Sequence, residues 1–398
     1  MVATTASYDS PLYQALPGLG YDGIVRVSIG GYYGTGILLD DGRTLLTAAH
    51  LASGWAKGGS ILFETLDGQK TVGISRVAIH PLFDSRNINN DLALIWLSAP
   101  APILAERYPL YRDADEIGQT FSLVGYGIPG TGSDGYVDGV SSSVRRVAEN
   151  RFDAEALELK QIFGDGLAWT PQADTLLVAD FDSGLIQNDA LGRFMGRYDS
   201  GLGILEGMIT PGDSGGPALI NGAIAGLASY GAALDLGSIK PDVDLILNAS
   251  FGELGFWTRV SPYQQWIDQS LRQSYADAPA RPEDVRKTLP EGNDGTSLAY
   301  FLVEFHGLRS NPDFWLSVDY RTLDGSAKAG EDYLAVNGTL ILYPGEYHAV
   351  IPVEIIGDDR PEPDEIFYLE IYNPVGGSFP DGAVSLIAAR TIVDDDWG

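Results

Sequence analysis

Short runs of alternating apolar and polar residues, separated by glycine, aspartate and asparagine, extend along most of the chain. Alternation with a period of two is typical of half-buried β-strands. A first series lies at residues 24–29, 35–39, 44–47, 61–66, 71–79 and 92–97. A second series lies at residues 121–124, 142–147, 175–181, 218–230 and 256–260. Short strands with polar punctuation predict small antiparallel barrels.

The period changes at residue 261. Ser261 and Pro262 suit the cap and first turn of a helix, and the apolar residues that follow repeat at helical spacing. We therefore predict a helix over residues 261–274, which ends the first domain.

A third series of alternating runs follows a linker that contains Pro279 and Pro282. These runs predict a β-sandwich and lie at residues 297–304, 314–320, 338–343, 348–355, 365–371 and 383–388. The predicted organisation is a lead-in at 1–22, a first domain at 23–276, a linker at 277–287 and a second domain at 288–398.

Three motifs contain residues suited to acyl transfer. Gly212-Asp213-Ser214-Gly215-Gly216-Pro217 predicts a tight turn that exposes the Ser214 hydroxyl beside the amides of Gly212 and Ser214. A base and an orienting acid are also needed. His50 ends the sequence Thr-Ala-Ala-His, and Asp91 stands directly before an apolar strand. We favour Asp91 over Asp84 as the orienting acid because its neighbours are apolar.

These motifs, in the order His, Asp, Ser, resemble those of the trypsin/chymotrypsin family of serine endopeptidases. The resemblance implies two antiparallel six-stranded β-barrels with a C-terminal helix, and a catalytic triad of His50, Asp91 and Ser214. It also implies an oxyanion hole formed by Gly212 and Ser214. Ser229 matches the serine that hydrogen-bonds the triad acid, although its spacing also suits an ordinary strand serine. Protein or peptide substrates are expected.

The same resemblance locates the primary specificity pocket. Met208 stands at its base, where a thioether cannot pair with a cation, and Gly231 and Gly255 match wall positions that keep it open. We therefore expect an apolar or aromatic residue before the scissile bond. The segment 232–254 is long for the family and can reshape the pocket. Leu51 and Thr210 stand where the family often has cysteines, and no ionic partner of Asp213 is identified.

The second domain is strongly acidic. Residues 277–398 contain 8 Lys and Arg against 23 Asp and Glu, about half of the net charge of −29. The acids stand mainly between the predicted strands, where they are either solvated surface or Ca²⁺ ligands. The segment 324–333, Gly357-Asp358-Asp359 and the final acidic triplet resemble a Calx-beta domain, an immunoglobulin-like sandwich. The resemblance implies Ca²⁺ bound by these ligands: Glu291, Asp332, Asp358, Asp359, Glu362, Asp394, Asp395 and Asp396.

Composition limits which partners and which location the protein can have. The net charge of −29 argues against nucleic acid and anionic membranes as partners. No apolar run is long enough to span a bilayer, and residues 1–20 lack the features of a signal peptide. There is no cysteine. We expect a secreted or cell-surface protein whose second domain regulates activity, stiffens the protein or contacts a cell-surface or matrix partner.

Two other functions remain open. The chain could be a catalytically silent binding or adhesion protein with a protease fold, although its complete triad favours an enzyme. It could also be a broad esterase or a quality-control protease, although no peptide-binding module is evident after the predicted barrels.

Overall fold

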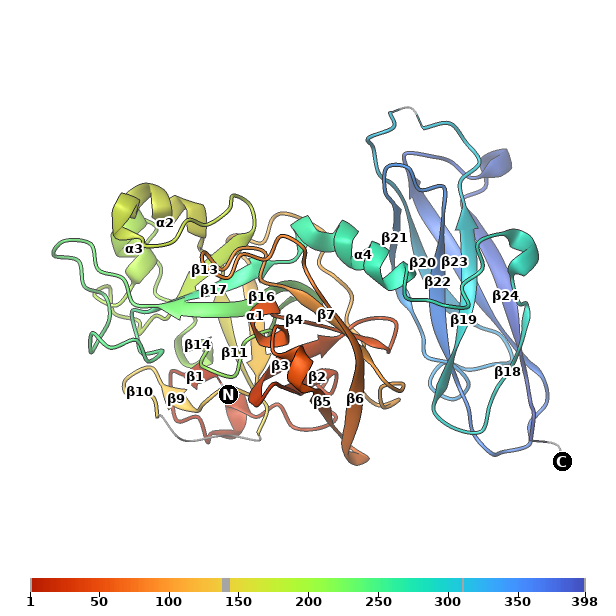
Figure 1. The fold of residues 1–398 in the computed structure, drawn as a ribbon, viewed down its shortest axis with the longest axis horizontal. Helices are drawn as coiled ribbons and strands as arrows, with labels where there is room; N and C mark the ends of the chain where they lie inside the picture. Colours follow the sequence, from red (N-terminus) through yellow and green to blue (C-terminus); the bar gives the residue numbers. More distant parts are fainter. Residues whose placement is uncertain (1, 138–143, 310, 397–398) are drawn as a thin grey trace. The chain divides into compact units, whose positions relative to one another are not determined.

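The structure is a computed structural model that describes residues 2–137, 144–309 and 311–396. The chain divides into two compact units. The first comprises Met1–Leu39 and Arg43–Gln264, and the second comprises Asp40–Gly42 and Gln265–Gly398. Strands dominate both units, as predicted (Figure 1).

The first sheet is a closed antiparallel barrel in the order β2-β3-β4-β7-β6-β5. Its interior contains Val25, Val27 and Phe63 from alternating runs and Ile95 from the continuous apolar run of β7. The first predicted series of strands is confirmed. The strands are β2 (Ile24–Ile29), β3 (Tyr32–Leu38), β4 (Thr44–Thr47), β5 (Gly59–Thr65), β6 (Gly68–Ile79) and β7 (Ala93–Leu97).

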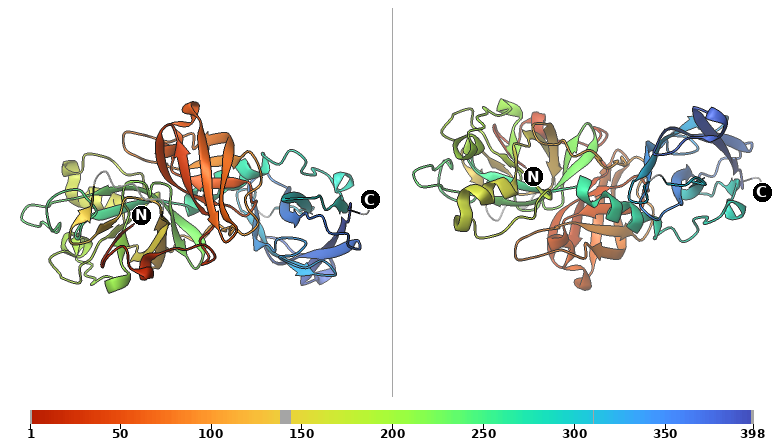
Figure 2. Two further views of the ribbon diagram at one scale, coloured as in Figure 1. Left: turned by 90° about the horizontal axis from the view of Figure 1, so that it is seen from below. Right: turned by 90° about the horizontal axis from the view of Figure 1, so that it is seen from above.

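A seven-stranded sheet in the order β11-β8-β15-β16-β17-β13-β12 forms the second half of the first unit (Figure 2). Its core contains Phe121, Phe152 and Trp257. The strands are β8 (Thr120–Gly125), β11 (Arg146–Arg151), β12 (Ala154–Glu155), β13 (Leu176–Asp180), β15 (Pro217–Ile220), β16 (Ala223–Ala232) and β17 (Leu254–Arg259). The strand predicted at 142–147 begins among residues 138–143, which lie outside the described residues.

The main-chain hydrogen-bond ladder of this second sheet does not close on itself, whereas the sequence predicted a closed six-stranded barrel. Its edge strands, β11 and β12, are consecutive in the chain and only two residues apart. At the break, the Asn150 side chain donates to the carbonyls of Asp180 and Gly207, at 2.8 and 3.0 Å. A side-chain amide therefore replaces main-chain pairing, and the sheet is a curled half-barrel.

A small four-stranded sheet, in the order β10-β9-β1-β14, begins at the amino terminus. Val2 and Ala3 are buried, and Ala3 pairs with Met208, so the start of the chain borders the predicted pocket. Val2 also lines a small cavity with Asp213. The strands are β1 (Ala3–Thr4), β9 (Gly130–Thr131), β10 (Gly135–Tyr136) and β14 (Gly207–Met208).

Helices are short. The predicted helix after residue 261 is present as a 3₁₀ turn at Ser261–Tyr263 and α4 (Gln264–Arg272). The other α-helices are α1 (Ala49–Ala52), α2 (Ala156–Phe163) and α3 (Ala190–Met195). Further 3₁₀ turns lie at Pro11–Tyr13, Trp55–Lys57, Gly164–Gly166, Gly203–Leu205, Pro282–Asp284 and Pro380–Gly382. Among the described residues, no helix is long and apolar enough to cross a membrane.

The second unit contains a sandwich of a five-stranded sheet, β18-β24-β23-β20-β21, and the pair β19-β22. Phe301, Ile351, Phe367 and Tyr333 belong to its core. The six predicted strands are confirmed, and β18 is additional. The strands are β18 (Thr288–Pro290), β19 (Thr296–Glu304), β20 (Leu316–Asp324), β21 (Asn337–Leu342), β22 (His348–Ile356), β23 (Glu365–Val375) and β24 (Ser385–Val393).

Candidate active site

His50 and Asp91 meet at the edge of the first barrel. His50 lies on α1, directly after β4, and Asp91 lies before β7, which pairs with β4. The His50 amide donates to Asp91 Oδ1 at 2.8 Å, and His50 Nδ1 lies 2.7 Å from Asp91 Oδ2. Because a carboxylate only accepts, Nδ1 carries the proton and Nε2 is left as the basic nitrogen.

A hydroxyl from the second sheet completes the environment of Asp91. The Ser229 Oγ, on β16, donates to Asp91 Oδ2 at 2.5 Å. Asp91 is 0% exposed, whereas the His50 side chain is 37% exposed. The buried carboxylate is therefore held by three donors, and the imidazole that it orients faces outward.

Ser214 lies in the turn that leads into β15. Gly212 and Gly215 have φ angles of +102° and +80°, which favour glycine, and the Ser214 carbonyl accepts from the Thr35 amide at 2.9 Å. The amides of Asp213, Gly215 and Gly216 donate to main-chain carbonyls. Among the described residues, the amides of Gly212 and Ser214 have no acceptor. These two amides are available to a ligand atom near Ser214.

Asp213 braces this turn from inside. It is buried, its Oδ1 accepts from the Gly127 amide at 2.8 Å, and its Oδ2 accepts from the Thr210 amide at 2.9 Å and hydroxyl at 3.1 Å. Burial raises the pKa of Asp213, although the Thr210 hydrogen bonds act in the opposite direction. Asp213, the residue directly before Ser214, therefore has a structural role in holding this turn.

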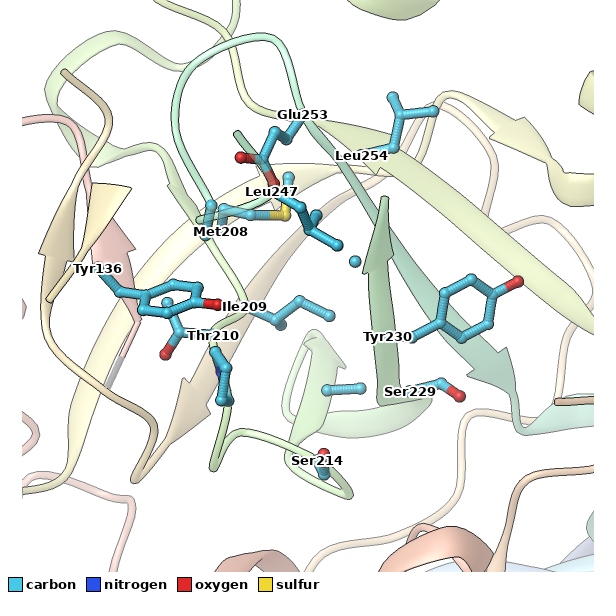
Figure 3. Close-up of a pocket in the computed structure, with 14 residues that line it drawn as sticks. Tyr136, Met208, Ile209, Thr210, Ser214, Ser229, Tyr230, Leu247, Glu253 and Leu254 are labelled. Carbon is cyan, nitrogen blue, oxygen red and sulfur yellow. The ribbon is translucent and has the colours of Figure 1, made fainter. Parts of the chain in front are cut away.

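A cavity of about 260 Å³ opens beside Ser214 (Figure 3). Met208 and Leu247 lie at the end away from Ser214, and Gly231 is a wall residue. Gly255 does not line the cavity. A Cβ at that position would come within 2.6 Å of Met208 Sδ, so its glycine leaves room for the methionine. The remaining cavity residues include Tyr136, Ile209, Thr210, Pro211, Ala228, Ser229, Tyr230, Ala249 and Leu254.

Glu253 is a pocket residue that the sequence analysis missed. It lines the same cavity near Met208 and is 1% exposed (Figure 3). Its Oε1 accepts from the amides of Asn248 and Ser250, at 2.7 and 3.1 Å. Burial raises its pKa to about 7, despite these hydrogen bonds. The only sequence signal was an acid two residues before Gly255, in a segment expected to reshape the pocket.

The acids of the second unit gather near the ends of β18, β23 and β24. Burial and the nearby Asp358, Glu362, Asp394 and Asp332 raise the pKa of Glu291 to about 7. Asp332, Glu362 and the unpredicted Glu365 each place an oxygen within 4.8 Å of the others. Burial, followed by the bond to Asp332, raises the pKa of Glu365.

The last acidic triplet joins this group through main-chain bonds. Asp394 Oδ2 accepts from the Glu362 amide at 2.7 Å, and Asp395 Oδ1 accepts from the Gly292 amide at 3.0 Å. Desolvation, followed by the charges of Asp394, Asp359, Asp395 and Asp358, raises the pKa of Asp396. Asp396 Oδ2 is inaccessible and has no hydrogen-bond partner among the described residues. An oxygen-rich site with an orphaned carboxylate atom fits a hard cation such as Ca²⁺.

Comparison with known proteins matches part of each unit to a family model. Residues 19–156 match the Trypsin family model, and residues 308–396 match the Calx-beta domain model. The chain is similar to sodium/calcium exchanger 2 of Mus musculus, with 36% identity over 155 residues, 32% of this chain and 17% of the exchanger. It is also similar to the exchanger Calx of Drosophila melanogaster, with 40% identity over 88 residues, 22% of this chain and 9% of Calx. The chain thus spans less than a fifth of these relatives.

Among solved structures, neuropsin, a serine protease expressed in mouse brain, aligns at 16% identity and a TM-score of 0.47, covering 65% of this chain and 98% of neuropsin. The family match and the barrel architecture define a protein of the trypsin-like serine protease fold. In this chain a Trypsin domain is followed by a Calx-beta domain.

Proposed function

We propose that this protein is a serine endopeptidase that cleaves peptide bonds through His50, Asp91 and Ser214. The main support is the environment of Asp91, whose carboxylate accepts from His50 Nδ1, the His50 amide and Ser229 Oγ. A structural histidine on a short surface helix has no need of such a buried, triply bonded carboxylate. General-base catalysis requires one.

The proposed reaction begins when His50 Nε2 takes the proton from Ser214 Oγ, which attacks the scissile carbonyl. Asp91 fixes the imidazole tautomer and stabilises the imidazolium. His50 then protonates the leaving amine, and water hydrolyses the acyl-enzyme after deprotonation by the same imidazole. The proton returns to Ser214 at the end of the cycle.

The amides of Gly212 and Ser214 supply the oxyanion hole in this proposal. Their neighbours in the turn already have acceptors, so these two can bind a developing negative charge without breaking an internal bond. Removal of one such donor typically costs ~3–4 kcal/mol of transition-state stabilisation.

We further propose that the pocket prefers an apolar or aromatic residue before the scissile bond. Met208, Leu247, Leu254 and Ala228 provide apolar walls. Glu253 adds one carboxyl group, which is neutral below about pH 7. The apolar preference is therefore expected to be strongest in mildly acidic solution.

The Calx-beta domain is proposed to bind Ca²⁺ through the acidic residues around Glu291, Asp332 and Glu362, with Glu365 as an added ligand. Hard carboxylate oxygens are the ligands that Ca²⁺ prefers, and extracellular modules bind it at roughly 0.1–1 mM. A secreted or cell-surface location, where Ca²⁺ is abundant, follows from this proposal. The chemistry at Ser214 needs no cofactor.

Labelling with a fluorophosphonate probe tests the enzymatic proposal. The wild type should be labelled and Ser214→Ala should not, because the probe reacts only with an activated serine. Ser75→Ala, whose hydroxyl bonds to main-chain carbonyls in the first barrel, is the matched control and should label normally. An unlabelled wild type that is folded by circular dichroism would favour the silent binding protein. Labelling without cleavage of any peptide library would favour an esterase.

A further inference from the structure

A second group of acids lies inside the first unit, where β13 ends and α3 begins. Asp180, Asp182 and Asp189 are 2%, 4% and 2% exposed. One carboxylate oxygen from each lies within 4.8 Å of the other two. The segment that contains them runs on through Glu206 to Met208 at the end of the pocket.

Main-chain amides account for much of the hydrogen bonding in this cluster. Asp180 Oδ2 accepts from the Leu191 amide at 2.8 Å, and Asp189 Oδ1 accepts from the Gly192 amide at 2.6 Å. Glu206 Oε1 accepts from the Asp182 amide at 2.6 Å. These bonds orient the carboxylates around one small volume.

Asp182 differs from the others. Its Oδ1 is inaccessible to solvent and has no hydrogen-bond partner among the described residues. A buried carboxylate oxygen without a donor is costly, because the water that it loses on folding is not replaced. The unpartnered Asp182 Oδ1 therefore indicates that a positive group is missing from this site.

The surrounding charges strengthen that conclusion. Asp153, Asp199 and Glu206 also lie near enough to affect the cluster. Arg151 pairs with Asp199, and Arg193 donates to the carbonyls of Gln187 and Lys240. Arg197 donates to the Asp153 carbonyl at 3.0 Å but pairs with Glu158, outside this group. Six carboxyl groups in this part of the described chain are therefore opposed by few positive charges.

The excess of buried acids over positive groups also changes the pKa values of the cluster. Burial, followed by the charges of neighbouring acids, raises the pKa of Asp182 and of Asp153. Burial also raises the pKa of Glu206, to about 7. These shifts have the same physical cause as the unpartnered Asp182 oxygen, which is the burial of several acids with too little positive charge beside them.

We propose that Asp180, Asp182 and Asp189 bind a Ca²⁺ ion within the trypsin-like unit, at a site separate from the acids of the Calx-beta domain. The ligands are all oxygens, without a histidine or cysteine that would favour zinc, and irregular backbone between residues 181 and 189 suits the flexible shell of Ca²⁺. The ion stabilises the segment 180–206, which continues directly into the end of the pocket at Met208.

The test uses the full chain with its Calx-beta acids disabled by Asp332→Asn and Glu362→Gln. Calorimetric titration with Ca²⁺ up to ~10 mM, above the range of extracellular sites, should still detect one binding event. Adding Asp182→Asn should abolish it, whereas adding the exposed-acid control Asp165→Asn should not.

Thermal unfolding gives a second readout that does not depend on peptidase activity. In chelator, Asp182→Asn should unfold at the same or a higher temperature than its parent, because the cluster then holds one buried acid fewer and the new amide can donate to a neighbouring carboxyl oxygen. In Ca²⁺, only the parent should gain several degrees. Absence of any Ca²⁺ binding in the parent, binding that survives Asp182→Asn, or an equal response to Mg²⁺ would each overturn the assignment. Failure of fluorophosphonate labelling would leave it intact.

Discussion

Glu253 should make the substrate preference of the pocket depend on pH. Its pKa is raised from 4.5 to about 7 by burial, which means that the folded protein disfavours the charged form by about 3 kcal/mol. The carboxyl is neutral at pH 5.5 and mostly charged at pH 8.5. A neutral pocket suits an apolar residue, whereas a charged one also pairs with lysine or arginine.

The perturbation is Glu253→Gln, which keeps an oxygen to accept from the amides of Asn248 and Ser250 but cannot ionise. A hydrogen bond to a charged group contributes about 1.5–3 kcal/mol. The wild-type ratio of kcat/KM for phenylalanine over lysine before the scissile bond should therefore fall at least ~10-fold between pH 5.5 and 8.5. The ratio cancels any effect of pH on the reaction steps that both substrates share.

In Glu253→Gln this ratio should stay constant with pH. The control Asp165→Asn removes an exposed acid from the same unit, and its ratio should change with pH as in the wild type. Unfolding adds an independent check. Because the folded state holds the proton more tightly, wild-type stability falls as pH rises from 4.5 through 7, and Glu253→Gln should gain up to ~3 kcal/mol over the wild type across that window. A pH-independent wild-type ratio, or the same pH dependence in both proteins, would refute the reasoning.

Three further outcomes are expected. Ser229→Ala removes the 2.5 Å bond to Asp91 and should lower kcat/KM about 10-fold while labelling persists; an unchanged rate would assign Ser229 to the fold alone. Gly255→Ala should lower the free energy of unfolding by about 1–3 kcal/mol in a denaturant titration, because its Cβ would meet Met208 Sδ at 2.6 Å. Gly231→Ala, with no atom nearer than 3.6 Å, is the control and should cost much less. Ca²⁺ should raise the melting temperature of the Calx-beta domain, and Asp332→Asn with Glu362→Gln should remove that increase; equal curves in chelator and Ca²⁺ would contradict it.

The strands were predictable because alternation is local. Strands β2, β5 and β11 bury about every second side chain, and strands β7 and β17 are continuous buried runs, so each pattern is visible in a handful of residues. The helices α2 and α3 were missed, although Glu155 and Glu158 form a capping box at the start of α2. Both helices lie in long connections between strands, where the surrounding strand pattern offers no guide to their position.

The site residues likewise divide into those that the sequence identifies and those that only the fold brings together. His50, Asp91 and Ser214 stand in motifs that are continuous in sequence, so the sequence alone identifies them as candidates. Glu253 and the Asp180 cluster depend on how the segments 232–254 and 180–206 fold back onto the second sheet. The sequence Asp-Phe-Asp at 180–182 was visible, but burial of both carboxylates beside Asp189 requires α3 to begin where it does.

The loops around the candidate active site are stabilised without disulfides. Leu51, which follows His50, packs against Gly34, where a Cβ would come within 2.5 Å of Leu51 Cδ2. The Thr210 hydroxyl lies 2.8 Å from the Ile128 carbonyl oxygen and 3.1 Å from Asp213 Oδ2, so the two oxygens share its one proton, and the Thr210 amide donates to Asp213. A buried leucine contributes about 1.5–3 kcal/mol and a disulfide typically about 2–4 kcal/mol, so local packing and hydrogen bonds reach a similar scale. Because these contacts are formed only in the folded state, the turn at Ser214 depends on an intact core, and reducing conditions should leave it unaffected.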